Sequence, residues 1–327
     1  MKLTNWMACG IILIFAASCG GSAEGPDVKT FSLPHVLNTD HPVHKALVKF
    51  ADEVERRSER RMKIRIQPGG ALGNEQELCD NVSNDVDSFT KISSTILETK
   101  TELAKVYSLP YLFRDKAHMW QVLDGPIGNE LLDMALDQNL KGICYFDAGF
   151  RSFYTKEIVE TPEDLQGMKI RVQKSVMMQK LVETLGASPQ QIAFSELYTA
   201  LDTGVVAGAE NNIPSYYTTR HYKVAPHYIF DEHVAVPDIL LMSAQRWNAL
   251  TPEEQGIFMD AAEVAKEFQK ELWQQANREQ MAAMEEEGVT FTQVEDKTPF
   301  VEATRPIYAE FEGTEIMEYV ERIRAVE

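Results

Sequence analysis

Two arginines and one asparagine are the residues that could best bind a small anion. Arg151 lies in the apolar stretch GFRSFY, Arg171 in the alternating stretch MKIRVQ, and Asn211 in GAENN, just before a tyrosine-rich segment. The planar guanidinium group of arginine makes two parallel hydrogen bonds to a carboxylate. If the fold brings the three side chains together, they could hold a carboxylate, although an arginine taken alone would more simply form a surface ion pair.

Other chemistry finds little support in the sequence. The motifs GxSxG, HExxH, GxxxxGK[ST] and CxxC do not occur. His41 and His44 have a spacing that metal ligands use, but they stand where a helix is expected to begin, so we expect no metal site. The loop PGGALGN lacks the glycine spacing and the following lysine of a phosphate loop, and we interpret it as a strand-to-helix turn. We therefore expect no cofactor and no enzyme.

Arg171 belongs to one of two nearly identical hexapeptides. MKIRIQ occupies 62–67 and MKIRVQ occupies 168–173. In both, apolar and polar residues alternate, which predicts a strand with one buried face and one cationic face. The pattern alone leaves open whether the cationic faces bind a ligand or face water.

Strand-like and helix-like segments alternate along the chain, which is typical of α/β domains. Strands are expected at FSLPHVL, MKIRIQ, SFTKIS, CYFDAGFRSFYT and MKIRVQ, and helices at 41–60, 75–82, 117–123, 129–140, 175–185 and 195–201. A longer helix should begin at Thr251, where Pro252 and Glu254 complete a good N-terminal cap, and should end before Gly288. At about 54 Å for ~36 residues it would exceed one domain, so we expect it to brace two.

Composition and charge limit the possible partners. The 327 residues are 44% hydrophobic, enough for two domains with their own cores. The net charge is −18, or −19 once Lys2 is lost with an export signal, which argues against nucleic acid and anionic lipid as partners. The basic run RRSERRMK (56–63) is flanked by glutamates and reads as a solvated helix end.

The N-terminus resembles an export signal. Lys2 precedes an apolar run, 6–17, that is too short to span a bilayer. AASC at its end resembles a lipobox, so residues 1–18 would be a signal peptide and Cys19 the lipidated residue, followed by a flexible tether over 19–30. The alternative is ordinary cleavage nearby and a freely soluble exported protein. Either way we expect a periplasmic or other extracytoplasmic location, with Cys79 and Cys144 as unpaired core thiols.

Three segments together resemble one known family. GFRSFYTKEIVETPEDLQGMKIRVQ, GASPQQIAFSELYTALDTGVVAGAENN and LPYLFRDKAHMWQVLDGP are similar to the extracytoplasmic solute-binding proteins of TRAP transporters, and the similarity runs from about Phe31 to Phe311. The resemblance implies a periplasmic-binding-protein-like α/β fold, in which two lobes joined by hinge strands and braced by a long helix close over a small carboxylate and deliver it to a membrane permease. The lobes are expected at 31–148 with about 237–276 (lobe I), and at 149–236 with about 277–323 (lobe II).

The resemblance also assigns roles to residues of lobe II. Arg171 would pair with the ligand carboxylate, Arg151 would assist, and Asn211 would cap the same group. Phe194, in AFSE, would be the aromatic wall, and Gln173 lies on the same strand face as Arg171. The family strand that matches MKIRIQ is not a ligand strand, so Arg65 is expected to be structural or solvent-facing.

Lobe I is expected to recognise the rest of the ligand. HVLNTDHPVHKA resembles the family members that bind sugar acids, so we expect D-glucuronate or D-galacturonate rather than a succinate-type diacid. Carboxylate, hydroxyl and amide groups can all bond a sugar hydroxyl, and Glu75 would repel a second carboxylate unless Lys91 offset it. The positions expected to face the ligand are His35, Asn38, Glu75, Lys91, Ser93 and Ser94.

Three other functions stay open at this point. The protein could bind a C4-dicarboxylate or another organic acid. It could report its ligand to a membrane receptor as a sensor. Least expected is an enzyme on the same scaffold, with Glu75 as acid or base.

Overall fold

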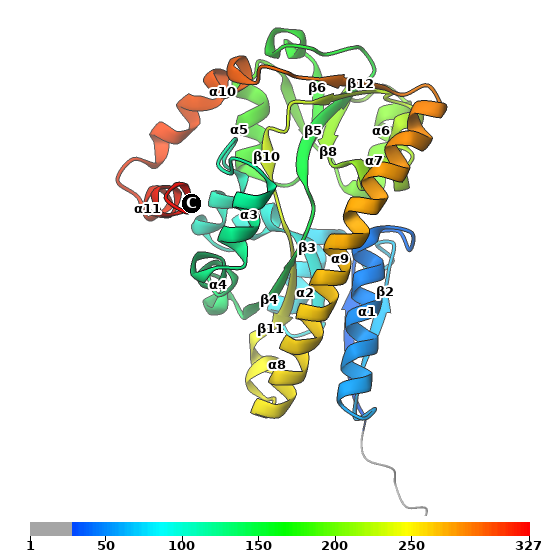
Figure 1. Cartoon of the computed structure of the whole chain (residues 1–327), viewed down its shortest axis with the longest axis vertical. Coiled ribbons are helices and arrows are strands. Elements are labelled where there is room, and N and C mark those ends of the chain that lie inside the picture. The colour runs from blue at the N-terminus through cyan, green and yellow to red at the C-terminus, as the bar shows by residue number, and fades with distance from the viewer. Residues whose placement is uncertain (1–27) are drawn as a thin grey trace, which may run out of the picture.

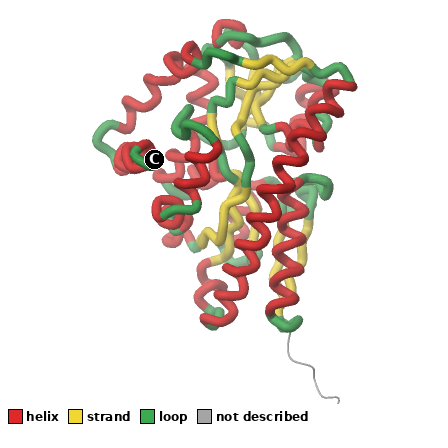
Figure 2. Tube along the Cα trace, in the orientation of Figure 1, coloured by secondary structure: helices red, strands yellow, loops and turns green. Residues whose placement is uncertain are grey.

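The computed structural model describes residues 28–327. Helices surround the strands of two α/β lobes, one below the other in the view of Figures 1 and 2. The predicted signal peptide, the acylation at Cys19 and most of the predicted tether lie outside the described residues.

Lobe I, at the bottom of Figure 1, contains two small sheets. Strands β1 (Lys29–Pro34) and β2 (Met62–Gln67) pair in parallel. Strands β3 (Phe89–Ser93), β11 (Asp238–Ser243) and β4 (Leu140–Phe146) form an antiparallel sheet with β11 in the centre. β11 is buried along its whole length, which explains why its sequence contains the continuous apolar run ILLM.

Lobe II, at the top, is built on one mixed sheet. The strand order is β12-β9-β5-β8-β6-β7, and β10 pairs with β5. The strands are β5 (Phe150–Thr155), β6 (Lys169–Val172), β7 (Ser188–Gln191), β8 (Gly208–Asn211), β9 (His227–Phe230), β10 (Val234–Ala235) and β12 (Thr290–Gln293).

Helices cover the sheets and fill the side of the molecule where the C-terminus lies (Figure 1). The α-helices are α1 (Pro42–Arg57), α2 (Glu75–Ser83), α3 (Lys116–Leu123), α4 (Pro126–Leu132), α5 (Val176–Thr184), α6 (Leu197–Asp202), α7 (Ile213–Thr218), α8 (Ala244–Asn248), α9 (Pro252–Glu286), α10 (Thr298–Thr304) and α11 (Glu315–Arg324). Short 3₁₀ turns, among them Ser94–Thr99 and Glu102–Ser108, link several of them.

The long helix α9 is confirmed as a brace across both lobes. It has 35 residues, and Thr251 and Glu254 form the expected reciprocal cap at its start. Its first half buries Phe258 in the core of lobe I, and Met284 near its end lies in the core of lobe II. Figure 1 shows it running diagonally beside α1 and up to α7.

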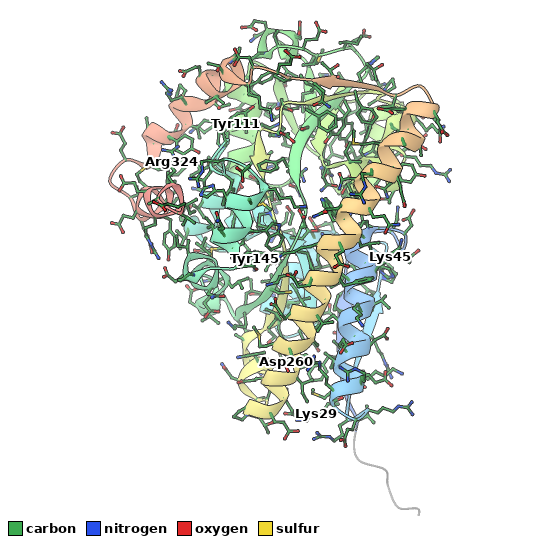
Figure 3. All side chains as sticks on the ribbon, viewed as in Figure 1. Lys29, Lys45, Tyr111, Tyr145, Asp260 and Arg324 are labelled. Atoms are coloured by element: carbon green, nitrogen blue, oxygen red, sulfur yellow. The ribbon has the colours of Figure 1, made fainter. Side chains whose placement is uncertain are left out.

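Ion pairs on the surface join β1 and α1 to the lower end of α9. Lys29 contacts Glu254 at 2.6 Å, and Arg57 contacts Asp260 at 2.9 Å. Figure 3 shows Lys29 and Asp260 at this end of the molecule. The basic run that contains Arg57 is therefore engaged with acidic neighbours, as expected.

The predicted strand FSLPHVL ends at Pro34 and the helix predicted over 41–60 ends at Arg57, and two further elements were wrong by more than a few end residues. CYFDAGFRSFYT is two strands in different sheets, because the chain leaves lobe I after Phe146 and turns at Gly149, whose φ is +60°. The helix predicted over 129–140 ends at Leu132; Asn139 takes a left-handed conformation with φ 58°, and Leu140 begins β4. The strands change sheet between 146 and 150 and between 235 and 238, while the exact lobe limits stay a prediction.

Gln269 of α9 holds the first of these crossings. Its side-chain amide accepts a hydrogen bond from the backbone N–H of Asp147 at 2.8 Å and donates one to the carbonyl of the same residue at 2.7 Å. Both partners are fully buried. The brace is thus bonded directly to the chain where it passes between the lobes.

Other local predictions agree with the structure. The loop 68–74 is the expected turn, closed by Asn74 as the N-cap of α2. Cys79 and Cys144 are buried free thiols, and burial raises the pKa of each to about 12. Within residues 28–327, no helix combines the length and the apolar character needed to cross a membrane.

Candidate functional site

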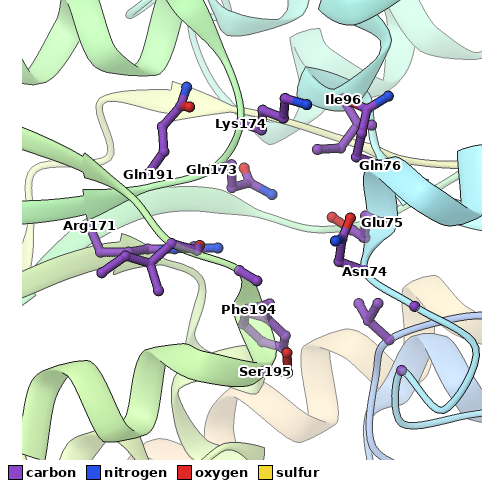
Figure 4. A pocket seen from close by; sticks show the side chains of 15 residues that line it. Asn74, Glu75, Gln76, Ile96, Arg171, Gln173, Lys174, Gln191, Phe194 and Ser195 are labelled. Atoms are coloured by element: carbon purple, nitrogen blue, oxygen red, sulfur yellow. The ribbon is translucent and has the colours of Figure 1, made fainter.

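Two adjoining cavities lie between the lobes. The larger has a volume of about 230 Å³ and contains Arg171; the smaller, of about 30 Å³, contains Arg151 and Asn211. Figure 4 shows the larger one, with Arg171 and Gln191 on one wall and Asn74, Glu75 and Gln76 on the other. Four residues line both cavities: Val36, Glu75, Gln173 and Phe194.

Arg171 is a buried cation without a protein counterion. Its side chain projects from β6 and the residue is 3% exposed. Nε donates to the carbonyl of Ile192 at 2.9 Å, but within residues 28–327 Nη1 has no hydrogen-bond partner and no carboxylate forms an ion pair with the group. Burial lowers the pKa of Arg171. An unpaired buried charge is costly, so this position favours an anion in the cavity.

Two rings pack near Arg171 without neutralising it. The guanidinium carbon lies 6.0 Å from the centre of the Phe194 ring, which suits a cation–π contact. His221 is also close, and burial together with the charge of Arg171 lowers the pKa of this histidine to about 3. His221 is therefore neutral at physiological pH and adds no second positive charge.

Arg151, in contrast, is already paired. Its guanidinium binds the carboxylate of Glu210, with Nη2 to Oε1 at 3.0 Å, and both residues are buried. Nη1 donates to Oδ1 of Asn211 at 3.0 Å, and the backbone N–H of Asn212 donates to the same oxygen at 2.9 Å. The Asn211 oxygen is thus occupied, which leaves its amide N–H groups for the cavity that it lines.

Lys91 is paired as well, on the side of lobe I. Its ammonium group lies 3.1 Å from Oε1 of Glu75 and 3.1 Å from Oδ1 of Asp238. The backbone N–H of Ser93 donates to the same Glu75 oxygen at 3.2 Å. Because two carboxylates surround one ammonium, this end of the cleft carries a net negative charge.

Gln173 joins the two lobes. Its side-chain oxygen accepts hydrogen bonds from the hydroxyls of Thr95 at 3.2 Å and Ser93 at 3.4 Å. Figure 4 places Gln173 between the two walls of the larger cavity. With the oxygen occupied by lobe I, the amide N–H groups of Gln173 are the atoms left for a ligand.

Three predicted positions do not line either cavity. The buried ring of His35 is bonded to the ring of His44 at 3.0 Å. Asn38 donates to a backbone carbonyl of α7, that of Thr218, at 3.0 Å and lies on the exposed rim. Ser94 is fully buried, and its hydroxyl has no partner among residues 28–327.

The histidines of this region do not form a metal site. His41 is the N-cap of α1 and accepts from the backbone N–H of Val43 at 3.2 Å. Within residues 28–327, no group of three or more histidine, cysteine, aspartate or glutamate side chains could hold a metal ion.

Several residues that line the cavities were not predicted from the sequence. Asp238 could have been found, since an acidic residue at the head of the apolar strand DILLMS is unusual. The others carry no such signal, because single polar residues are common in helices, strands and loops alike. The unpredicted lining residues with polar side chains are Asn74, Gln76, Lys174, Gln191, Ser195, Asn212, Ser215 and Asp238.

A wider hollow of about 530 Å³ lies elsewhere, between α9 and the segment 111–116. Several of its cations are engaged by the protein itself. Lys116 is paired with Asp147, and Lys297 with Glu232. The arginines that line it, Arg114 and Arg278, are exposed. Among residues 28–327, this hollow therefore contains no unpaired buried cation comparable to Arg171.

Comparison with known proteins identifies the class. The model of the bacterial extracellular solute-binding protein family 7 matches residues 33–314, and the chain belongs to this family. This confirms the predicted relationship to the solute-binding components of TRAP transporters. A solute-binding protein of Chromohalobacter salexigens is 32% identical over 272 residues, which cover 83% of this chain and 81% of that protein.

Two solved structures are similar over nearly the whole described chain. A TRAP periplasmic solute-binding protein of Xanthobacter autotrophicus, with bound β-D-galacturonate, is 35% identical with a TM-score of 0.88 and covers 91% of this chain and 100% of its own. That of Roseobacter denitrificans, with bound β-D-glucuronate, is 32% identical with a TM-score of 0.89 and the same coverage. The two-lobed fold predicted from the sequence is confirmed.

Proposed function

We propose that this protein captures a hexuronate, D-glucuronate or D-galacturonate, between its lobes and delivers it to the membrane permease of a TRAP transporter. The observation that carries the proposal is Arg171, a buried guanidinium group that faces the cavity without a protein anion. The ligand carboxylate would supply the missing charge. The N–H groups of Asn211 and Gln173 would donate to the same molecule.

The opposite wall supports a ligand with hydroxyl groups. Glu75 and Ser93 offer acceptor oxygens there, and the cation Lys91 is already neutralised by two carboxylates. A second ligand carboxylate would meet net negative charge at this place, which disfavours a succinate-type diacid. The uronates bound by the two similar structures support the same ligand class.

Calorimetric titration of ligand-free protein with glucuronate, galacturonate, glucose and succinate tests the proposal. We expect the uronates to bind far more tightly than succinate. The polar side chains that would bond the sugar hydroxyls are left without hydrogen-bond partners by an analogue that lacks these hydroxyls. Glucose should hardly bind, since it leaves Arg171 without an anion. Succinate binding as tightly as the better uronate would refute the sugar-acid assignment.

Location and partner complete the proposal. Cys19 would carry a lipid that anchors the exported protein, and this lipid would be its only contact with a membrane surface. The permease is implied by family membership and not by any feature of the described surface. Uptake of the uronate by cells that carry the permease genes, abolished by deletion of this gene, is the expected result; a sensor would instead alter signalling without altering uptake.

A further inference from the structure

Glu75 and Asp238 hold one ammonium group between them at the lobe I end of the cleft. Lys91 is on β3 and Asp238 is the first residue of the neighbouring strand β11, where it pairs with Ser93. Glu75 begins α2 and reaches the same ammonium. The Lys91 side chain is 3% exposed, so the group is closed off from bulk water.

Each carboxylate uses one oxygen to hold Lys91. These are Oε1 of Glu75 and Oδ1 of Asp238, both at 3.1 Å. Among residues 28–327, the other oxygens, Oε2 and Oδ2, accept no hydrogen bond. Both side chains line the smaller cavity and are 12% and 10% exposed. Two acceptor oxygens therefore remain available on residues that line the smaller cavity.

The charge of this group selects the kind of ligand atom. Two carboxylates and one ammonium leave a net negative charge, which repels an anion but attracts hydrogen-bond donors. Burial raises the pKa of Asp238 to about 6, and the charge of Lys91 opposes this shift. A ligand hydroxyl can donate a hydrogen bond to each of these carboxylate oxygens, and such charge-assisted bonds are stronger than those between neutral groups.

We propose that Glu75 and Asp238 together bind two neighbouring hydroxyls of the ligand, and that Asp238 is a residue that determines specificity for polyhydroxylated acids. This inference rests on the proposed function, because Arg171 must fix the carboxylate at the other end. Lys91 is then a positioning residue: it orients both carboxylates, and its positive charge reduces the repulsion between them in one buried site.

The test compares Asp238→Asn with a matched control. The asparagine keeps an oxygen for Lys91 but replaces the second acceptor by a donor. Asp85→Asn is the control, because Asp85 forms an ion pair with Arg246 outside both cavities. Glucuronate is titrated by calorimetry into both variants and wild type, and succinate is measured by displacement of glucuronate.

We expect Asp238→Asn to weaken glucuronate binding about 10- to 100-fold, the usual effect of losing hydrogen bonds to a charged group. Binding of succinate should not weaken, because its second carboxylate meets less negative charge in this variant. The preference for glucuronate over succinate should therefore fall at least about tenfold. Asp85→Asn should leave both affinities within about twofold of wild type.

Two results would overturn the inference. One is an Asp238→Asn variant that binds glucuronate within about twofold of wild type. The other is an equal loss of affinity for glucuronate and succinate, which would mean that Asp238 only supports the fold. If wild-type protein bound no uronate at all, the proposed function itself would fail; uronate binding that needs Arg171 but not Asp238 would reject this inference alone.

Discussion

Arg171 and Arg65 occupy the same place in two nearly identical hexapeptides, yet only one of them is buried. Arg171 is 3% exposed in the wall of the cleft, while Arg65 lies on the exposed face of β2. The difference comes from the surroundings. β6 lies inside a sheet between β7 and β8, and its Arg171 lines the cavity between the lobes, whereas β2 pairs only with β1.

The two arginines should therefore respond differently to substitution. Arg171→Ala should cost roughly 2–5 kcal/mol of uronate binding, the usual loss when one partner of a buried charge pair is removed. Arg65→Ala is the matched control and should change binding by less than about 0.5 kcal/mol. Calorimetric titration measures both, and an equal loss in the two variants would contradict the unequal roles.

The buried pair of His233 and Asp231 should make folding stability depend on pH. Burial alone would lower the pKa of His233, but Asp231, whose Oδ2 lies 2.6 Å from Nδ1, and Glu210, at 3.8 Å from Nε2, outweigh it and raise the pKa to about 9. Arg151 is bound to the same Glu210. Because the folded pKa exceeds the unfolded value of 6.5, the stabilisation is complete below pH 6.5 and is lost as pH rises through 9.

Urea unfolding at several pH values between 6 and 10 measures this effect. The free energy of unfolding should fall by at most about 1.4 kcal/mol per pH unit in that window. His233→Gln removes the titrating group, so the variant should be less stable at pH 6.5 and should show a flatter profile. Parallel profiles for wild type and variant would exclude His233 as the source.

The clamp between Gln269 and Asp147 should stabilise the crossing between the lobes. Gln269→Leu leaves the buried N–H and C=O of Asp147 without partners, at about 1–3 kcal/mol each. Gln275→Leu, on the exposed side of the same helix, should cost less than about 0.5 kcal/mol. Chemical denaturation compares the two; similar stabilities would show that the clamp contributes little.

The proposed lipidation of Cys19 predicts where the protein is found. Cys19→Ser should release it from the membrane fraction into the soluble exported fraction. Mass spectrometry of the mature N-terminus checks the modification directly, and an unmodified terminus at another residue would contradict it.

Much of the local structure was fixed by short-range pattern. The alternation in MKIRIQ and MKIRVQ defines two strands, and Thr251 with Glu254 defines the start of α9. These predictions succeeded because the alternation of apolar and polar residues and the capping of a helix both depend on residues a few positions apart. Residue type and family resemblance single out Arg151, Arg171 and Asn211 as candidates for carboxylate binding, and the structure places each in the wall of one of two adjoining cavities.

Only the tertiary structure decided which charges were neutralised. Arg151 is paired with Glu210, and Lys91 with both Glu75 and Asp238, whereas Arg171 has no counterion among the described residues. Lys91 and Asp238 are separated by more than a hundred residues and meet because β3 and β11 are neighbours in one sheet. Sequence periodicity holds no information on such contacts, since strand pairing and burial depend on how the whole chain packs.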